Sequence, residues 1–107
     1  MDEKLKELIN IIKAEMAKSG GQELILFGSH ATNSAKEDSD YDFLIIVNDS
    51  ISGEQIDQLS FNIRMRLWEN DSVLPMDLVF KKKEQYRIES ASFGSLAYNV
   101  KLTGVAL

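Results

Sequence analysis

Three short apolar runs, separated by polar segments, constrain the fold of this chain more than any other feature. They cover residues 23–27, 43–47 and 76–80, and the third follows Pro75 directly. Runs of about four to eight residues bounded by turn-forming residues are typical of buried β-strands. The sequence therefore predicts a small sheet whose strands come from separate parts of the chain.

Helical periodicity occupies the segments around these runs. Apolar residues recur every three or four positions in residues 5–16, 56–67 and 93–100, as they do in amphipathic helices. Ser52 and Gln55 stand at capping-box spacing before the second of these helices. The order of elements predicts an α/β (α+β) fold, with a small mixed β-sheet of about three or four strands flanked by helices.

Composition narrows the function classes. The chain has 107 residues, of which 44% are hydrophobic and 27% charged, and its net charge is −5. These values predict one globular domain, and no apolar run approaches the roughly 20 residues of a membrane span. The absence of Cys excludes disulfides, and the charged start lacks a secretory pattern, so we expect a cytoplasmic protein. The negative net charge disfavours nonspecific binding to nucleic acid, which usually needs a basic face.

A Gly-Ser turn and a pair of carboxylates lie between the first two apolar runs. Gly28-Ser29 ends the first run, and ten residues separate Ser29 from Asp40-Tyr41-Asp42. Alternate residues of a strand project from one face, so Asp40 and Asp42 are expected to converge. Mg²⁺ prefers carboxylate oxygens together with substrate phosphates. A glycine turn at the start of a short helix can cradle phosphate, so Gly28 and Ser29 are candidates to bind a nucleoside triphosphate.

Asp77 interrupts the third apolar run, Met76-Asp77-Leu78-Val79-Phe80. A carboxylate in a buried strand is costly unless it is paired, bound to a metal or placed at an exposed end. If this strand lies beside the strand of Asp42, Asp77 completes a site of three carboxylates. The alternative is an exposed position on an edge strand.

Together, these residues resemble the minimal nucleotidyltransferases of the DNA polymerase β-like superfamily. The resemblance rests on Gly28-Ser29, on Asp40-x-Asp42 at ten residues' distance, and on Asp77 in a Met-Asp-Leu-Val context, and it covers most of the chain. It implies a single nucleotidyltransferase domain over residues 1–107. It also implies transfer of a nucleoside monophosphate from a triphosphate, with ATP as the first expectation. Asp40, Asp42 and Asp77 would be the catalytic residues and would bind Mg²⁺, with two ions expected.

The resemblance also implies a protein partner. Members of this family are often encoded beside a HEPN-domain protein and act as its antitoxin, some of them by attaching AMP to the HEPN protein. We therefore expect the antitoxin of a toxin–antitoxin pair, with the HEPN-domain protein as acceptor. The sequence leaves a homo-oligomer open.

One departure from the family pattern concerns the turn. The family often reads Gly-Ser-x-Ala-Arg-Gly, whereas residues 28–33 read Gly-Ser-His-Ala-Thr-Asn and lack the arginine and the second glycine. His30 is either a phosphate contact or a surface residue. The replacements for the missing positive charge that remain open are Lys36, Arg64, Arg66 and the run Lys81-Lys82-Lys83.

Three functions remain open at this point. The first is an enzyme acting on a protein acceptor, which suits a chain too short to hold a separate acceptor domain. The second is an antitoxin with a vestigial site that acts by binding, which the missing arginine favours. The third is a small-molecule transferase of the aminoglycoside type.

Two apolar features also remain open. Trp68 either stacks on a base or packs in the core or an interface. The apolar residues 103–107 either dock on a partner or pack on their own domain.

Overall fold

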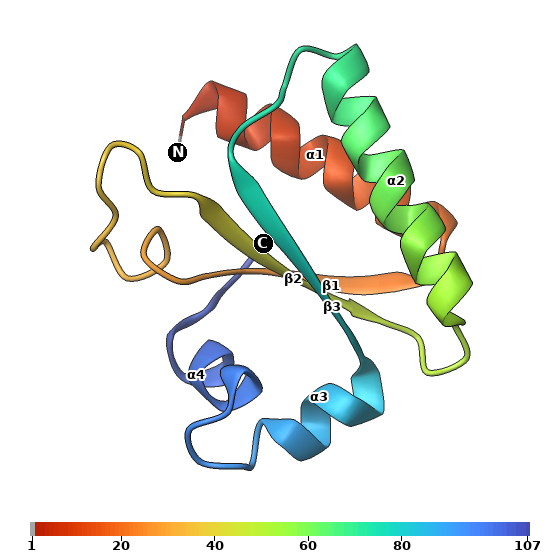
Figure 1. Cartoon of the computed structure of the whole chain (residues 1–107), viewed down its shortest axis with the longest axis vertical. Helices are drawn as coiled ribbons and strands as arrows, with labels where there is room; N and C mark the ends of the chain where they lie inside the picture. Colours follow the sequence, from red (N-terminus) through yellow and green to blue (C-terminus); the bar gives the residue numbers. More distant parts are fainter. Residues whose placement is uncertain (1) are drawn as a thin grey trace.

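The computed structural model describes residues 2–107, and its sheet crosses the molecule between two pairs of helices (Figure 1). The elements in chain order are α1 (Glu3–Lys18), β1 (Gly21–Phe27), β2 (Tyr41–Val47), α2 (Gly53–Glu69), β3 (Met76–Lys82), α3 (Lys83–Glu89), α4 (Leu96–Thr103) and β4 (Val105–Ala106). The predicted α/β class is confirmed. Within residues 2–107, no helix has the length and apolar character needed to cross a bilayer.

The sheet is mixed, with strand order β3-β2-β1-β4. β1 pairs antiparallel with β2 and with β4, whereas β2 and β3 are parallel. Parallel neighbours need a long crossover connection, and α2 supplies it between β2 and β3. This crossover brings the start of β3 next to the start of β2, which is the arrangement on which the site depends.

One face of the sheet is closed by α1 and α2. Leu8 and Ile12 of α1, Phe43 and Ile45 of β2, and Ile63 of α2 are all fully buried in one cluster. The capping box of α2 is confirmed, because Gln55 N donates to Ser52 Oγ at 3.1 Å and Ser52 N donates to Gln55 Oε1 at 2.8 Å. The two long helices thus follow their apolar periodicity, and this face carries most of the core.

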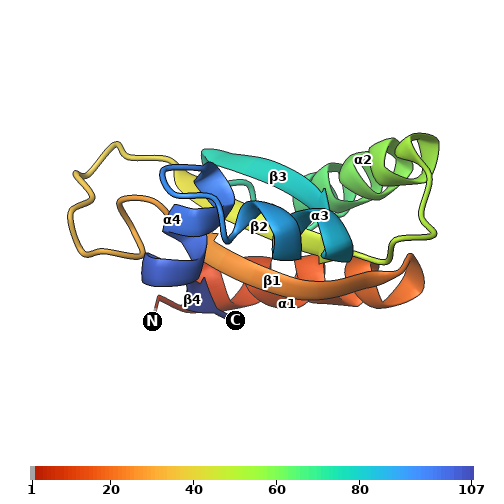
Figure 2. The same ribbon diagram turned by 90° about the horizontal axis from the view of Figure 1, so that it is seen from below.

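The other face is covered by the shorter helices α3 and α4, which Figure 2 shows on one side of the strands. Its buried cluster is smaller and contains Ile25, Leu44, Ile46 and Val100. The sequence did not predict α3, which buries none of its residues. The last helix begins at Leu96, so Phe93 lies outside it and is 88% exposed, contrary to its place in the predicted stripe.

The apolar C-terminal residues pack on their own domain. Val105 and Ala106 form β4 against Leu26 and Ile25, and Leu107 N donates to Leu24 O at 2.9 Å. Residues 105–107 thus pair with β1 through their backbone, while the side chains of Val105 and Ala106 are exposed, and docking on a partner stays a prediction. The side chain of Trp68 is 71% exposed at the end of α2, so it does not belong to the core.

Candidate functional site

The carboxylates of Asp42 and Asp77 lie side by side at the start of two parallel strands. Asp42 of β2 pairs in register with Asp77 of β3 on one side and with Phe27 of β1 on the other. Asp42 shares its face of the sheet with Leu44 and Ile46 because side chains alternate along a strand. The pair therefore lies on the α3 and α4 face. Asp77 is exposed on the edge strand β3, as the alternative interpretation of its position expects, and its part in a site of three carboxylates stays a prediction.

The charges at this point interact. The pKa of the Asp42 carboxyl is raised, first by burial and then by the charge of Asp77 and a hydrogen bond with it. Asp40, two residues earlier and just outside β2, raises the same pKa through its charge, whereas His30 lowers it. Asp40 is thus close enough for its charge to act on Asp42. Like charges placed together in this way favour binding of a cation.

The donor set suits a hard divalent cation in its chemistry. Asp42 and Asp77 supply carboxylate oxygens from neighbouring strands, and Mg²⁺ is usually held by one or two carboxylates together with substrate phosphates. Among residues 2–107, however, no group of three or more His, Cys, Asp or Glu side chains converges on one point as a ready metal site. The three-carboxylate metal site stays a prediction.

Gly28 lies directly against the Asp42 side chain. Its φ is +75°, a conformation that favours glycine, and a Cβ atom at this position would overlap Asp42 Oδ2. From the sequence, we expect glycine at residue 28 because it allows the backbone to approach a phosphate closely. The structure gives a further reason, since any side chain at residue 28 would collide with the carboxylate. Gly28 of the Gly-Ser turn is therefore in contact with Asp42.

The chain after Gly28 forms hydrogen-bonded turns and not the predicted short helix. Ala31 N and Thr32 N both donate to Gly28 O, at 3.1 and 3.3 Å, and Asn33 then adopts a φ of +59°, which ends the helical direction. Within residues 2–107, the N–H groups of Ser29 and His30 donate to no backbone carbonyl in this turn. Free N–H groups next to a glycine are suited to an anion such as a phosphate.

His30 connects this turn to the carboxylate segment. Its ring stacks on Tyr41 with centroids 3.7 Å apart and planes 12° from parallel, and its Nε2 lies 2.9 Å from Ser39 O. Sequence reasoning left His30 open between a phosphate contact and a surface residue. In the structure, His30 contacts Ser39 and Tyr41, the two neighbours of Asp40 in the chain. The signal in the sequence that could have indicated this contact is Tyr41, an aromatic residue between Asp40 and Asp42 on which the His30 ring can stack.

The candidates to replace the missing arginine are not equivalent. Arg66 Nε lies 3.6 Å from Glu15 Oε2 in an ion pair between the two long helices, and Arg64 lies on the same helix α2, away from the carboxylate face. Lys81 Nζ forms a 2.6 Å ion pair with Glu89 Oε1. Lys36 lies in the exposed segment between the Gly-Ser turn and Asp40. Of the candidates, Lys36 is the one that shares this loop.

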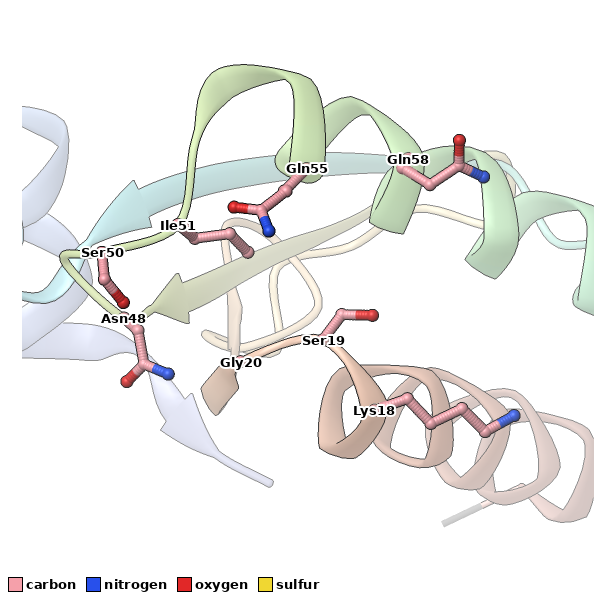
Figure 3. A pocket seen from close by; sticks show the side chains of 8 residues that line it. All are labelled: Lys18, Ser19, Gly20, Asn48, Ser50, Ile51, Gln55 and Gln58. Carbon is pink, nitrogen blue, oxygen red and sulfur yellow. The ribbon is translucent and has the colours of Figure 1, made fainter.

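A polar depression of about 390 Å³ lies at the opposite end of β2 (Figure 3). Its wall includes Lys18, Asn48, Gln55 and Gln58, and Asn48 directly follows the last residue of β2. Asp42 stands near the first residue of that strand, so about five residues of extended chain, roughly 15–20 Å, separate the two places. This depression does not belong to the carboxylate site.

The sequence pattern of the nucleotidyltransferase domain matches residues 5–98, which is most of the chain. The chain belongs to the nucleotidyltransferase domain family. The matched span contains the Gly-Ser turn, the Asp pair and Asp77. Among curated proteins, no sequence matches the chain.

A solved structure described as "Crystal structure of the toxin-antitoxin with AMP-PNP" has the same fold as this nucleotidyltransferase domain. The two share 21% sequence identity with a TM-score of 0.53, over 91% of this chain and 69% of the other. At this identity, the similarity shows the fold alone.

Proposed function

We propose that this domain is a metal-dependent nucleotidyltransferase that transfers AMP from ATP to a protein acceptor. The observation that carries the proposal is the pairing of Asp42 with Asp77 across parallel strands, with Gly28 in contact with Asp42. Two interacting carboxylates beside a turn with free N–H groups suit a cation and a triphosphate at the same place. Membership in the nucleotidyltransferase domain family supports the same chemistry.

Each residue then has a separate task. The N–H groups after Gly28 would bind phosphate oxygens, and Asp40 and Asp42 would hold Mg²⁺, which when bound neutralises the triphosphate. The acceptor hydroxyl oxygen forms a bond to the α-phosphorus while the bond to pyrophosphate breaks. Asp77 would either hold a second Mg²⁺ or take the proton of the hydroxyl.

The proposed acceptor is a HEPN-domain protein, and the pair is proposed to form a cytoplasmic toxin–antitoxin system. The likeness in fold to a structure described as a toxin–antitoxin supports a protein partner.

Incubation with a HEPN-domain protein as the proposed partner, ATP and Mg²⁺ tests the proposal. The intact mass of the partner should increase by one or more AMP units. Asp77→Asn keeps the side-chain shape but removes the charge, so it should preserve complex formation and slow the transfer. An unchanged partner mass with wild-type protein would overturn the enzymatic proposal.

A second function, neutralisation of the partner by binding alone, is favoured by one specific observation. The turn lacks the arginine and second glycine of the family pattern. In that case the partner would be inhibited equally by wild type and by Asp77→Asn, with no mass change in either mixture.

A further inference from the structure

His30 contacts both neighbours of Asp40. Its Nε2 is 2.9 Å from the carbonyl oxygen of Ser39, and its ring stacks on Tyr41 at 3.7 Å. Asp40 lies between these two residues in the chain, so one side chain from the Gly-Ser turn holds the segment on either side of this carboxylate.

Tyr41 is held by β2 and by its packing on the core cluster, whereas the residues before Asp40 have mainly local contacts. The hydrogen bonds of residues 36–39 are local, since Lys36 N donates to Ser39 Oγ at 2.8 Å and Ser39 N donates to Lys36 O at 3.0 Å. Tyr41 N donates to Pro75 O at 2.9 Å on the side of β3. On the side of β1, the corresponding contact is the hydrogen bond between His30 Nε2 and Ser39 O.

The chemistry of the ring explains why histidine suits this position. Ser39 O can only accept a hydrogen bond, so Nε2 must carry the proton in this contact. The flat ring also stacks on Tyr41, which a purely aliphatic side chain cannot do. Phenylalanine would keep the stacking without a donor, and glutamine would keep a donor without the ring. The two contacts can therefore be removed separately.

We propose that His30 is a positioning residue that fixes Asp40 relative to Asp42 and the Gly-Ser turn. The inference rests on the proposed function, because it assigns His30 the task of holding one of the proposed metal ligands. His30 touches the backbone and ring that flank Asp40, and it leaves binding of the cation to the carboxylates. It also couples the nucleotide-binding turn to the metal-binding segment.

The test compares wild type with His30→Ala, His30→Phe and His30→Gln. Glu37→Gln is the matched control, since Glu37 is exposed in the same loop. Hydrogen exchange of the amides of residues 35–41 reports on the segment itself, and Mn²⁺ titration followed by electron paramagnetic resonance reports on the carboxylates. His30→Ala should speed exchange in this segment by about fivefold and weaken Mn²⁺ binding by about the same factor, as expected for loss of one hydrogen bond. His30→Phe and His30→Gln should change hydrogen exchange and Mn²⁺ binding less than His30→Ala, because each keeps one of the two contacts.

Two results would overturn the inference. The first is unchanged exchange of residues 35–41 in His30→Ala. The second is faster exchange with unchanged Mn²⁺ binding, which would show that His30 orders the loop without positioning Asp40. A wild-type protein that binds no Mn²⁺ would overturn the proposed metal site and with it the role of His30 toward Asp40, and this outcome is recognised from the wild type alone. Melting curves of all variants confirm that the fold is kept.

Discussion

The two faces of β2 serve different purposes. On one face, Phe43, Ile45 and Val47 are fully buried under α1 and α2. On the other face, Leu44 and Ile46 are buried beside α4, whereas Asp42, at the start of the strand, is half-buried against Asp77. One strand therefore contributes a closed core on one side and a charged pair at one end of the other side. The comparison separates the residues that stabilise the fold from those available for chemistry.

The first prediction concerns the closed face and has the largest expected effect. Phe43→Ala removes a side chain that is 0% exposed, so it should lower the free energy of unfolding by about 3–5 kcal/mol. Leu44→Ala, on the other face of the same strand, is the matched comparison. Its cluster is smaller, so its loss should be lower than that of Phe43→Ala. Urea denaturation measures both, and a larger loss at Leu44 would reverse the assignment of the main core.

The second prediction concerns the charged pair. Asp42→Ala or Asp40→Ala should lower nucleotide transfer at least about a hundredfold, or about 2.7 kcal/mol in activation free energy, because each removes a proposed metal ligand. The fold should remain intact, since neither side chain belongs to a buried cluster. Transfer of labelled nucleotide and melting temperature are measured together. Asp38→Ala, in the exposed loop, should keep wild-type transfer, and wild-type rates in the Asp40 or Asp42 variant would contradict the site.

The third prediction concerns the contact between the turn and the carboxylate. Gly28→Val places a branched side chain at a φ of +75° and against Asp42 Oδ2. The strained conformation alone should cost about 1–3 kcal/mol of stability. Binding of ATP should weaken as well, because Asp42 has to move. Calorimetry with and without Mg²⁺ measures the binding, and Gly53→Ala is the control, since a Cβ there meets no atom within 4 Å. Unchanged ATP binding by Gly28→Val would exclude the turn from the site.

Local patterns predicted the elements that carry their own periodicity. A local sequence pattern of a few residues is enough to predict five elements, namely α1, α2, β1, β2 and β3. The spacing of Asp40 and Asp42 can be recognised in the same way. In contrast, β4 has only two residues and depends on pairing with β1, and α3 has no buried face. Neither leaves a local pattern.

The contacts that build the site depend on tertiary structure. The register of Asp42 with Asp77 joins residues 35 positions apart (77 − 42), and it follows from how the crossover helix seats β3 against β2. The stacking of His30 on Tyr41 likewise requires the loop between them to fold back. A sequence pattern can indicate that carboxylates and a glycine turn belong together. It cannot give their register or the aromatic contact that fixes them.

The last prediction concerns the charge of Asp42 and has the smallest expected effect on stability. Its direction is opposite to that of Phe43→Ala, because removal of the Asp42 charge should stabilise the fold, so it separates the two faces of β2 most sharply. The pKa of Asp42 is raised above its ordinary value of 3.8, so the folded state holds a proton more tightly than the unfolded state does. The ionised carboxylate therefore destabilises the fold at neutral pH. This penalty disappears as the pH falls below the ordinary value. Asp42→Asn should stabilise the metal-free protein at pH 7 by about 0.2–1 kcal/mol, the usual size of a cross-strand pair interaction.

Denaturation at pH 7 and near pH 3 measures this difference, which should vanish at the lower pH because Asp42 is then protonated in both states. Addition of Mg²⁺ at pH 7 should reverse the order, since a cation that binds only the folded wild type adds to its stability. Asp38→Asn serves as the control for loss of one negative charge elsewhere. A wild type that is more stable than Asp42→Asn without metal would mean that the paired carboxylates stabilise the fold, and the proposed division of β2 into a stabilising face and a charged end would fail.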